Sequence, residues 1–292
     1  MQKTNRSKNI CPVCKNSRIT EYWAMPGYKL AKCPKCETVW DKLPPEEISA
    51  IYDKTYFINE NPKGGYANYF EAMRINRKTF SGRLEKIEKT LGKKGTLLDV
   101  GCALGDFLAE AKTRGWKDIQ GIEISHYAVV FARGKGLKVN EGVLENNSYP
   151  PNFFEVVTYQ DVIEHIPNPK DELKKAYKIL KPGGIIFLVT PDVRGLWAKL
   201  LGPLWYHYKP REHILYFSKK SIEVALAKAG FKNILVRNTY HVFSLEYILN
   251  RLRYYQPNFF EFLLKMVRKT KVKNLPFKLY TGEIEAWGQK LP

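Results

Sequence analysis

Short apolar segments alternate with amphipathic ones from residue 96 onward, and turns that contain glycine separate them. Apolar runs of strand length predict buried strands, whereas apolar positions at helical spacing predict helices that pack on them. This alternation is typical of a mostly parallel sheet with helices on both faces, and it predicts an α/β fold. We expect strands at 96–100, 118–123, 138–140, 154–160 and 184–190, and helices at 106–113 and 170–180.

The C-terminal part continues this pattern and then interrupts it. Apolar positions at helical spacing over 218–229 end at Gly230, a common helix C-cap, and 231–237 resumes a strand. Residues 277–289 are the candidate for the last strand. The stretch at about 244–275 predicts a helical insertion in which apolar stripes lead into a basic run. This basic insertion can dock on the protein itself or on a second subunit, lie on an anionic membrane, or grip nucleic-acid phosphates.

Four of the five cysteines form two closely spaced pairs near the N-terminus. Each pair lets two thiolates reach one ion from a tight turn, and the loop between the pairs has the roughly 15 to 20 residues of a zinc ribbon. Four thiolates close a tetrahedral site, so this zinc would be structural. A disulfide framework is disfavoured by the lack of an apolar export signal, and two matched pairs would be unusual for redox dithiols. The predicted ligands are Cys11, Cys14, Cys33 and Cys36.

A strand, a glycine turn and a helix follow one another at 96–113. Glycine permits a ligand to approach the backbone and the helix N-terminus offers unpaired N–H groups, so Gly101 and Gly105 suit a nucleotide-type site. Glu123, at the end of the next strand, can accept both hydroxyls of a ribose. Cys102, the fifth cysteine, is expected to be a small buried filler within the turn.

Four further segments have a recognisable pattern: LLDVGCALGDFL at 97–108, GIEIS at 121–125, FFEVVTYQDVIEHIPNP at 153–169 and LKPGGIIFLVTP at 180–191. They resemble the motifs of the class I S-adenosylmethionine (SAM) dependent methyltransferases, in particular those of the ubiquinone and sugar type. The resemblance implies a seven-stranded Rossmann-like sheet with a reversed last hairpin, here preceded by the zinc ribbon. NAD-dependent dehydrogenases share the turn and the ribose acid but have no counterpart of the run from Gln160 to His165.

The resemblance also implies which residues hold SAM. The two glycines would pass under the methionine and ribose, and Glu123 would hold the ribose diol. Val143 and Leu144 would flank the adenine, and Gln160 would border the methionine end. Ala103 stands where the family usually has a glycine, which narrows the methionine side without closing it. The cofactor-binding candidates are Asp99, Gly101, Cys102, Ala103, Gly105, Glu123, Ile124, Val143, Leu144, Gln160 and Asp161.

The chain accordingly divides into three predicted parts. Residues 1–43 form the zinc-ribbon module, 44–79 an aromatic helical linker, and 80–292 the SAM-dependent methyltransferase domain with its insertion. The aromatic residues of the linker either pack the module against the main domain, which we favour, or form a lid over a ligand.

Methyl transfer is an in-line displacement at a sulfonium, so the enzyme positions the acceptor and, for a hydroxyl, removes its proton. Polar residues follow the fourth and the fifth strand, at the carboxyl edge where open α/β sheets bind ligands. We expect both groups to face one cleft. The catalytic candidates are His213, Glu212, His165 and Glu164.

Two mechanisms fit these residues. His213 can act as a general base, and the pair Glu212-His213 resembles that of zinc-ribbon-bearing sugar methyltransferases. Alternatively, Asp161 and Glu164 together with His165 and His213 are similar to the set that holds a divalent ion such as Mg²⁺ in small-RNA 2′-O-methyltransferases and ubiquinone-type O-methyltransferases. There the ion acts as a Lewis acid, although Asp161 stands where those families carry a longer Glu. A third interpretation is that both histidines only satisfy backbone groups of their loops.

The formal net charge of +19 favours phosphate-bearing partners or an anionic membrane over neutral metabolites, unless it reflects only a lysine-rich surface. No apolar run reaches the roughly 20 residues of a spanning helix. We therefore expect a cytoplasmic protein, with the inner face of the membrane as a further place if the insertion binds there.

These observations support two hypotheses on function. The first is O-methylation of a sugar, a glycan or a lipid-linked small-molecule precursor. The alternative is an RNA methyltransferase, for rRNA or tRNA, whose zinc ribbon and basic surface bind the nucleic acid. A non-catalytic SAM-binding scaffold is disfavoured by the intact Asp99, Gly101, Gly105 and Glu123.

Overall fold

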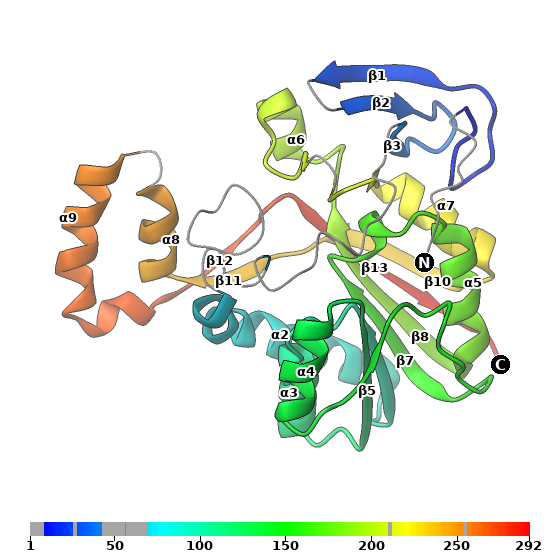
Figure 1. Cartoon of the computed structure of the whole chain (residues 1–292), viewed down its shortest axis with the longest axis horizontal. Helices are drawn as coiled ribbons and strands as arrows, with labels where there is room; N and C mark the ends of the chain where they lie inside the picture. The colour runs from blue at the N-terminus through cyan, green and yellow to red at the C-terminus, as the bar shows by residue number, and fades with distance from the viewer. Residues whose placement is uncertain (1–8, 26–27, 43–55, 57–68, 210–211, 254–255) are drawn as a thin grey trace.

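The structure is a computed structural model that describes residues 9–25, 28–42, 56, 69–209, 212–253 and 256–292. The strands of the central sheet are β4 (Thr96–Val100), β5 (Asp118–Glu123), β6 (Lys138–Glu141), β7 (Phe154–Gln160), β8 (Leu180–Pro191), β10 (Lys232–Asn238) and β13 (Glu283–Gln289). They lie in the order β10-β13-β8-β7-β4-β5-β6 (Figure 1). This confirms the predicted α/β fold with a Rossmann-like sheet of seven strands.

One strand of this sheet runs against its neighbours. β13 lies antiparallel between β8 and β10, whereas β4 to β8 pair in parallel. Glu283, the first residue of β13, therefore pairs with Pro191 at the carboxyl end of β8. The prediction of one strand over 277–289 was wrong, because Gly282 (φ +91°) interrupts it and residues 276–279 pair elsewhere.

The sequence Lys-Pro-Gly-Gly at 181–184 has the composition of a turn, but it stays within the sheet. The amide of Gly183 donates to the carbonyl of Lys290 at 2.7 Å, and the amide of Lys290 donates to the carbonyl of Gly184 at 2.9 Å. Gly183 has a φ of +79°, so it bends the strand without ending it. β8 therefore begins earlier than the predicted strand at 184–190.

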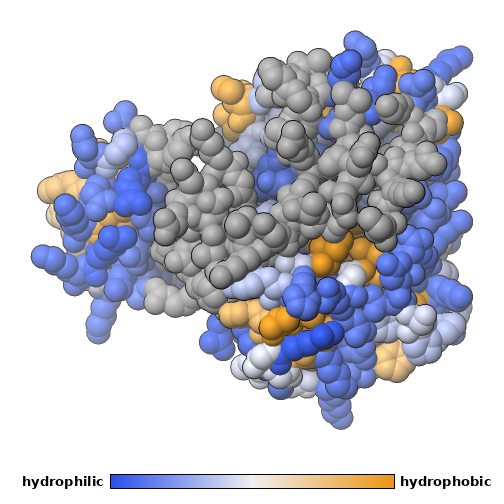
Figure 2. Space-filling view, in the orientation of Figure 1, coloured by the Kyte–Doolittle hydropathy of each residue, from blue (hydrophilic) through white to orange (hydrophobic). Residues whose placement is uncertain are grey.

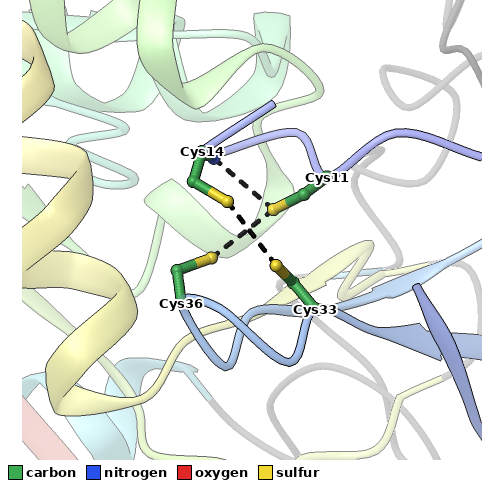
Figure 3. A group of neighbouring side chains, drawn as sticks. All are labelled: Cys11, Cys14, Cys33 and Cys36. Atoms are coloured by element: carbon green, nitrogen blue, oxygen red, sulfur yellow. Dashed lines mark hydrogen bonds between the residues drawn. The ribbon is translucent and has the colours of Figure 1, made fainter. Parts of the chain in front are cut away.

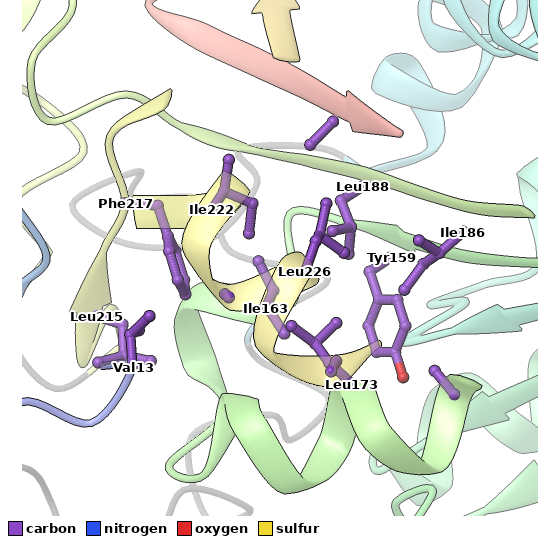
Figure 4. Close-up of a cluster of buried hydrophobic side chains, with 14 of the residues drawn as sticks. Val13, Tyr159, Ile163, Leu173, Ile186, Leu188, Leu215, Phe217, Ile222 and Leu226 are labelled. Atoms are coloured by element: carbon purple, nitrogen blue, oxygen red, sulfur yellow. The ribbon is translucent and has the colours of Figure 1, made fainter. Parts of the chain in front are cut away.

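Helices cover both faces of the sheet, and each set has its own buried apolar cluster. Figure 4 shows the cluster in which side chains of β7 and β8 meet those of two helices. The helix α7 (Lys219–Ala229) is one of these two, and it ends, as its sequence predicts, at Gly230 in the left-handed conformation (φ +109°). α5 (Pro169–Ile179) and α7 (Lys219–Ala229) belong to this cluster, and α2 (Tyr69–Leu91), α3 (Asp106–Thr113) and α4 (His126–Gly134) belong to the other.

The N-terminal module shares a sheet with the main domain. Its strands are β1 (Thr20–Met25), β2 (Tyr28–Lys32) and β3 (Val39–Asp41), and β9 (Leu215–Tyr216) of the main domain pairs with β3. The amide of Asp41 also donates to the carbonyl of Ile214 at 3.1 Å. Val13 of the module lies beside Leu215 in the cluster of Figure 4. The main domain therefore supplies the fourth strand of the module's sheet.

A two-stranded ribbon carries a pair of helices away from the central sheet (Figure 1). The ribbon consists of β11 (His241–Ser244) and β12 (Pro276–Leu279), and between them lie α8 (Leu245–Leu252), α9 (Pro257–Arg268) and the 3₁₀ helix η4 (Lys271–Asn274). α8 and α9 pack on each other, and Leu249 and Leu264 are buried between the elements of this pair. None of the helices in the described part of the chain is long and apolar enough to cross a bilayer.

Candidate functional site

The four paired cysteines converge on one point (Figure 3). The Sγ atoms of Cys11 and Cys36 are 3.5 Å apart, as are those of Cys14 and Cys33, and all four lie within 4.8 Å of one another. A zinc ion with four thiolate ligands at about 2.3 Å holds its sulfur atoms about 3.8 Å apart. These side chains therefore fit a zinc ion.

Two turns of the same shape present these thiols. The amide of Lys15 donates to the carbonyl of Cys11 at 3.0 Å, and the amide of Glu37 donates to the carbonyl of Cys33 at 2.9 Å. Lys15 and Glu37 both take the left-handed conformation, with φ values of +63° and +67°. Because sulfur would occupy all four positions around the ion, the site suits a structural role and leaves no place for a catalytic water.

The turn after β4 is shaped by left-handed residues at alternate positions. A Cβ at Gly101 (φ +72°) would lie 2.4 Å from Cγ2 of Val162, and one at Gly105 (φ +80°) would lie 2.5 Å from Cδ1 of Leu137. Ala103 has a φ of +48°, a conformation that costs a non-glycine residue about 1 kcal/mol. Only glycine therefore fits at positions 101 and 105, where Val162 and Leu137 leave no room for a side chain, and the backbone is held under mild strain at Ala103.

Glu123 connects this turn to the next strand. Its Oε2 accepts a hydrogen bond from the amide of Ala103 at 2.8 Å, and its Oε1 accepts one from the amide of Ser125 at 2.9 Å. Burial raises the pKa of this carboxyl. Each carboxylate oxygen keeps a second lone pair, so Glu123 can accept ribose hydroxyls while it fixes both loops.

Two of the other predicted cofactor residues are fully enclosed beneath the turn. Asp99 accepts a hydrogen bond from Oγ1 of Thr158 at 2.6 Å, and burial raises its pKa to about 7. Cys102 packs against Gly121, where a Cβ would lie 2.5 Å from its Sγ, and burial raises the pKa of its thiol. Cys102 is therefore a space-filling residue, as its sequence context indicates.

The remaining predicted cofactor residues lie at the carboxyl ends of the strands. Ile124 and Val143 are half-buried, whereas Leu144 is buried in the core. Gln160 ends β7, and Asp161 follows it with a φ of +57°. The structure thus brings the predicted residues to one edge of the sheet, although the side chain of Leu144 belongs to the apolar cluster beneath that edge.

A buried arginine that no motif indicated joins this edge. Arg83 of α2 is only 3% exposed, and its Nη1 donates to Oε1 of Gln160 at 2.9 Å. Its charge also acts on Asp99 and Asp161, and its Nε has no hydrogen-bond partner among the described residues. A buried guanidinium with donors left over suits the carboxylate of a ligand. Arg83 is one of several basic residues in its helix, so nothing in the sequence distinguishes it.

Glu164, His165 and His213 meet at the same edge. Each offers one ligand atom, and these three atoms lie within 4.8 Å of one another. Oε2 of Glu164 accepts from Oγ1 of Thr190 at 2.9 Å, and Nδ1 of His165 donates to the carbonyl of Glu212 at 2.7 Å. Oε1 of Glu164 and Nδ1 of His213 are buried and have no hydrogen-bond partner in the described part of the chain. These two atoms are available to a ligand.

Burial sets the protonation of this cluster. It lowers the pKa of His165 to about 4 and moves that of His213 well below its usual value. Burial also raises the pKa of Glu164. Both imidazoles are therefore uncharged at neutral pH, and an uncharged imidazole can accept a proton or bind a metal ion.

The carboxyl groups of two predicted residues, Glu212 and Asp161, do not belong to the cluster of Glu164, His165 and His213. Oε2 of Glu212 lies 3.6 Å from Nζ of Lys209, so Glu212 contributes its carbonyl to His165 rather than its carboxylate to the cluster. Asp161 lies outside the group of three, and burial raises its pKa to about 7. The four-residue ligand set expected from the sequence is thus a set of three.

A second acidic residue extends the cluster toward Arg83. Glu283 is hydrogen-bonded to Nε2 of His241, and its Oε1 lies 3.8 Å from Nε2 of His207. Burial acts to raise the pKa of Glu283, but the interactions with His241 and His207 outweigh it and lower this pKa to about 2. The ring of His207 stacks on that of His213 with 6.0 Å between centroids, so four of the five histidines form one connected group. The scarcity of histidine was the one signal in the sequence that could have pointed to His207 and His241.

Comparison with known proteins relates this chain to methyltransferases. A family model for a methyltransferase domain matches residues 69–236. Among curated proteins, a ubiquinone biosynthesis O-methyltransferase from Pectobacterium carotovorum subsp. carotovorum is 32% identical over 124 residues, which are 40% of this chain and 51% of that protein. The corresponding protein of an Azoarcus species is 33% identical over 116 residues, 37% of this chain and 49% of that one. The chain spans about half the length of the curated relatives it matches.

Solved structures share the fold at lower identity. A SAM-dependent methyltransferase from Archaeoglobus fulgidus has a TM-score of 0.53 and 19% identity, covering 76% of this chain and 98% of its own. Phosphoethanolamine N-methyltransferase 2 of Haemonchus contortus, in complex with SAM, has a TM-score of 0.55 and 17% identity, covering 87% of this chain and 62% of its own. At these identities the likeness concerns the fold alone.

Proposed function

Since the chain belongs to the methyltransferase domain family, we propose that it transfers a methyl group from SAM to a hydroxyl of a sugar, a glycan or a lipid-linked small-molecule precursor. One observation carries the proposal: at the sheet edge that also holds Glu123 and the glycine turn, Glu164 and His213 each have a buried polar atom without a hydrogen-bond partner among the described residues. A hydroxyl acceptor needs such a group to take its proton, whereas a tertiary amine or a thiolate does not.

The cofactor is proposed to bind along the turn after β4. Glu123 would hold the ribose hydroxyls, and Arg83 would pair with the carboxylate of the methionine part. Tyr56, from the predicted 44–79 linker, packs against the buried pair Leu104 and Ala128 of the main domain, which supports the favoured prediction that the linker packs on this domain. The rest of that linker up to residue 68 lies outside the described residues. We propose that the chain divides into the zinc-ribbon module at 1–43, the linker at 44–79 and the methyltransferase domain at 80–292.

The transfer itself is proposed to use His213 as the base. The acceptor oxygen attacks the methyl carbon in line with the sulfur, the S–CH₃ bond breaks, and the sulfonium becomes the neutral thioether of S-adenosylhomocysteine. The hydroxyl proton passes to Nδ1 of His213, which has no partner among the described residues. His165, oriented by the carbonyl of Glu212, packs its ring against that of His213 at 4.7 Å between centroids and keeps it in place.

The same three side chains support a second mechanism. Glu164, His165 and His213 fit a divalent ion such as Mg²⁺ or a softer metal, because each offers a ligand atom within 4.8 Å of the others. Glu164 and His213 also each have a buried polar atom without a hydrogen-bond partner in the described part of the chain. Such an ion would supply Lewis acidity toward the acceptor hydroxyl. Two imidazoles with one carboxylate are a donor set that favours zinc, iron or manganese-type ions over Mg²⁺, which prefers oxygen.

Substitution of His213 tests the proposal. With radiolabelled SAM and a sugar or lipid-linked acceptor fraction, His213→Ala is expected to lower transfer by about a hundredfold or more, since general-base catalysis supplies about that factor. SAM affinity, measured by calorimetry, should be unchanged. Equal turnover of wild type and variant would dismiss the base.

Chelation separates the two mechanisms. Treatment with a strong chelator, followed by readdition of one equivalent of zinc per chain, refills the four-cysteine site, because four thiolates bind zinc more tightly than one carboxylate and two imidazoles do, and leaves Glu164, His165 and His213 without an ion. Full activity in that state supports proton transfer to His213. Activity that returns only with a second metal ion supports the metal mechanism instead.

A further inference from the structure

The helix pair carried by the ribbon leaves one apolar face without a partner among the described residues. Phe259, Phe262 and Met266 of α9 are 58%, 60% and 57% exposed. Their spacing of three and four positions places them on one side of the helix, opposite the buried Leu264. Single exposed apolar side chains are common, but an ordered row on a projecting helix marks an interaction surface.

Basic side chains border this face of α9. Both acids of the helix pair are already engaged, Glu246 with Arg268 and Glu261 with Arg253. Five lysines on or next to the pair form no ion pair with any described residue: Lys265, Lys269, Lys271, Lys273 and Lys278. The helix pair that carries the row of large apolar side chains therefore has more basic than acidic side chains.

A second apolar surface lies beside the cluster that contains His207. α6 (Leu196–Leu201) and the 3₁₀ helix η3 (Gly202–Leu204) expose Leu196, Leu200 and Leu204 by 57%, 67% and 83%. Nε1 of Trp197 donates to the carbonyl of Tyr280 at 2.9 Å, which holds α6 against the end of the ribbon. Figure 2 shows hydrophobic surface both over α6 and over α9.

We infer that α9 and α6 together dock on an anionic lipid bilayer, with their exposed leucine, phenylalanine and methionine side chains in the interface and the lysines on phosphate groups of the lipids. The complementarity of charge favours this partner over a second copy of the chain, because two copies of net charge +19 repel each other. Apolar side chains combined with basic residues are the composition that binds bilayer surfaces. This docking goes beyond methyl transfer and does not depend on it.

Vesicle flotation tests the inference on the full-length protein. Wild type is expected to float with phosphatidylcholine vesicles that contain about 30% phosphatidylglycerol, to float poorly with pure phosphatidylcholine, and to release in about 0.5 M salt. The triple variant Phe259→Ser/Phe262→Ser/Met266→Ser should lower the bound fraction by about tenfold. The matched control Val130→Ser/Leu291→Ser, which changes exposed apolar positions elsewhere, should bind like wild type.

Two readouts keep the outcomes distinct. Affinity for S-adenosylhomocysteine, measured by calorimetry, should be equal in all variants and shows that they fold. Flotation that is the same for the triple variant and wild type overturns the inference. So does a wild type that fails to float but forms a dimer that the triple variant abolishes, since a second copy would then be the occupant.

Discussion

Arg83 is the residue whose role depends most on tertiary structure. It is buried beside Gln160 with one donor left over, so a carboxylate of the cofactor would complete its hydrogen bonds. A charge-assisted hydrogen bond contributes about 1.5 to 3 kcal/mol, and Arg83→Met should therefore weaken SAM binding by about tenfold to a hundredfold. Calorimetric titration with SAM measures the effect.

Arg77 of the same helix provides the matched control. Its Nε contacts Glu110 at 2.8 Å, and its side chain is 66% exposed. Arg77→Met should therefore leave SAM affinity unchanged, since exposed ion pairs contribute little. If both variants bind SAM equally, Arg83 has no role in holding the cofactor.

The sequence indicated Gly101, Gly105 and Glu123 because their places follow from a single strand-turn-helix unit. Arg83 and Glu283 could not be found in this way. They reach the same edge from α2 and from the reversed strand β13, elements that are far from the motifs along the chain. Glu283 lies at the carboxyl edge only because β13 runs antiparallel to β8.

At the scale of elements, the pairing of β3 with β9 links the cysteine site to His213. Val39 pairs with Tyr216 and Trp40 with Leu215, which lie three and two residues after His213, the residue proposed as the base. Loss of zinc by Cys36→Ser should release β3, because a structural zinc site supplies much of the folding free energy of so small a module. Hydrogen exchange of the amides at 214–217 is then expected to accelerate, while that of β4 stays unchanged. Equal protection in both proteins would show that β9 does not need the module.

The contact of α5 with β7 contains a carboxyl whose pKa affects stability. Tyr159 donates its hydroxyl proton to Oε1 of Glu172 at 3.0 Å, and burial raises the pKa of Glu172 to about 7. The carboxyl of Glu172 therefore binds its proton more tightly in the folded state than in the unfolded state. The resulting stability is complete below the unfolded pKa of about 4.5 and is lost as the pH rises through about 7.

Glu172→Gln removes this titration and keeps the hydrogen bond from Tyr159. Urea unfolding should give similar free energies for wild type and variant at pH 5. At pH 8 the variant is expected to be more stable by about 2 to 3 kcal/mol. A difference that does not change with pH would mean that Glu172 titrates normally in the folded protein.

Element boundaries were predictable where local chemistry determines them. β4, β5 and β7 begin and end where the apolar runs do, and α7 ends at Gly230. The break at Gly282 and the pairing of β3 with β9 were not predictable, because each depends on a partner strand that is distant in the chain. In both cases hydrogen bonding to that partner decides where the strand lies.

At the scale of the whole molecule, the helix pair is attached so that it can be removed cleanly. Ser244 and Pro276 are register partners in the ribbon, so a two-residue Asn-Gly turn can join them in place of residues 245–275. His241, which contacts Arg83 and Glu283, remains in β11. The buried Leu249 and Leu264 leave together, so the deletion exposes little of the main core.

The shortened protein is expected to fold and to bind SAM within about twofold of wild type, because the cofactor residues lie on the central sheet and α2. Its flotation with anionic vesicles should fall at least as much as that of the α9 variant. A deletion that folds but loses SAM affinity would instead show that the helix pair supports the cofactor site through the ribbon. Since α6 remains in this protein, any residual flotation measures the share of docking that α6 and η3 provide.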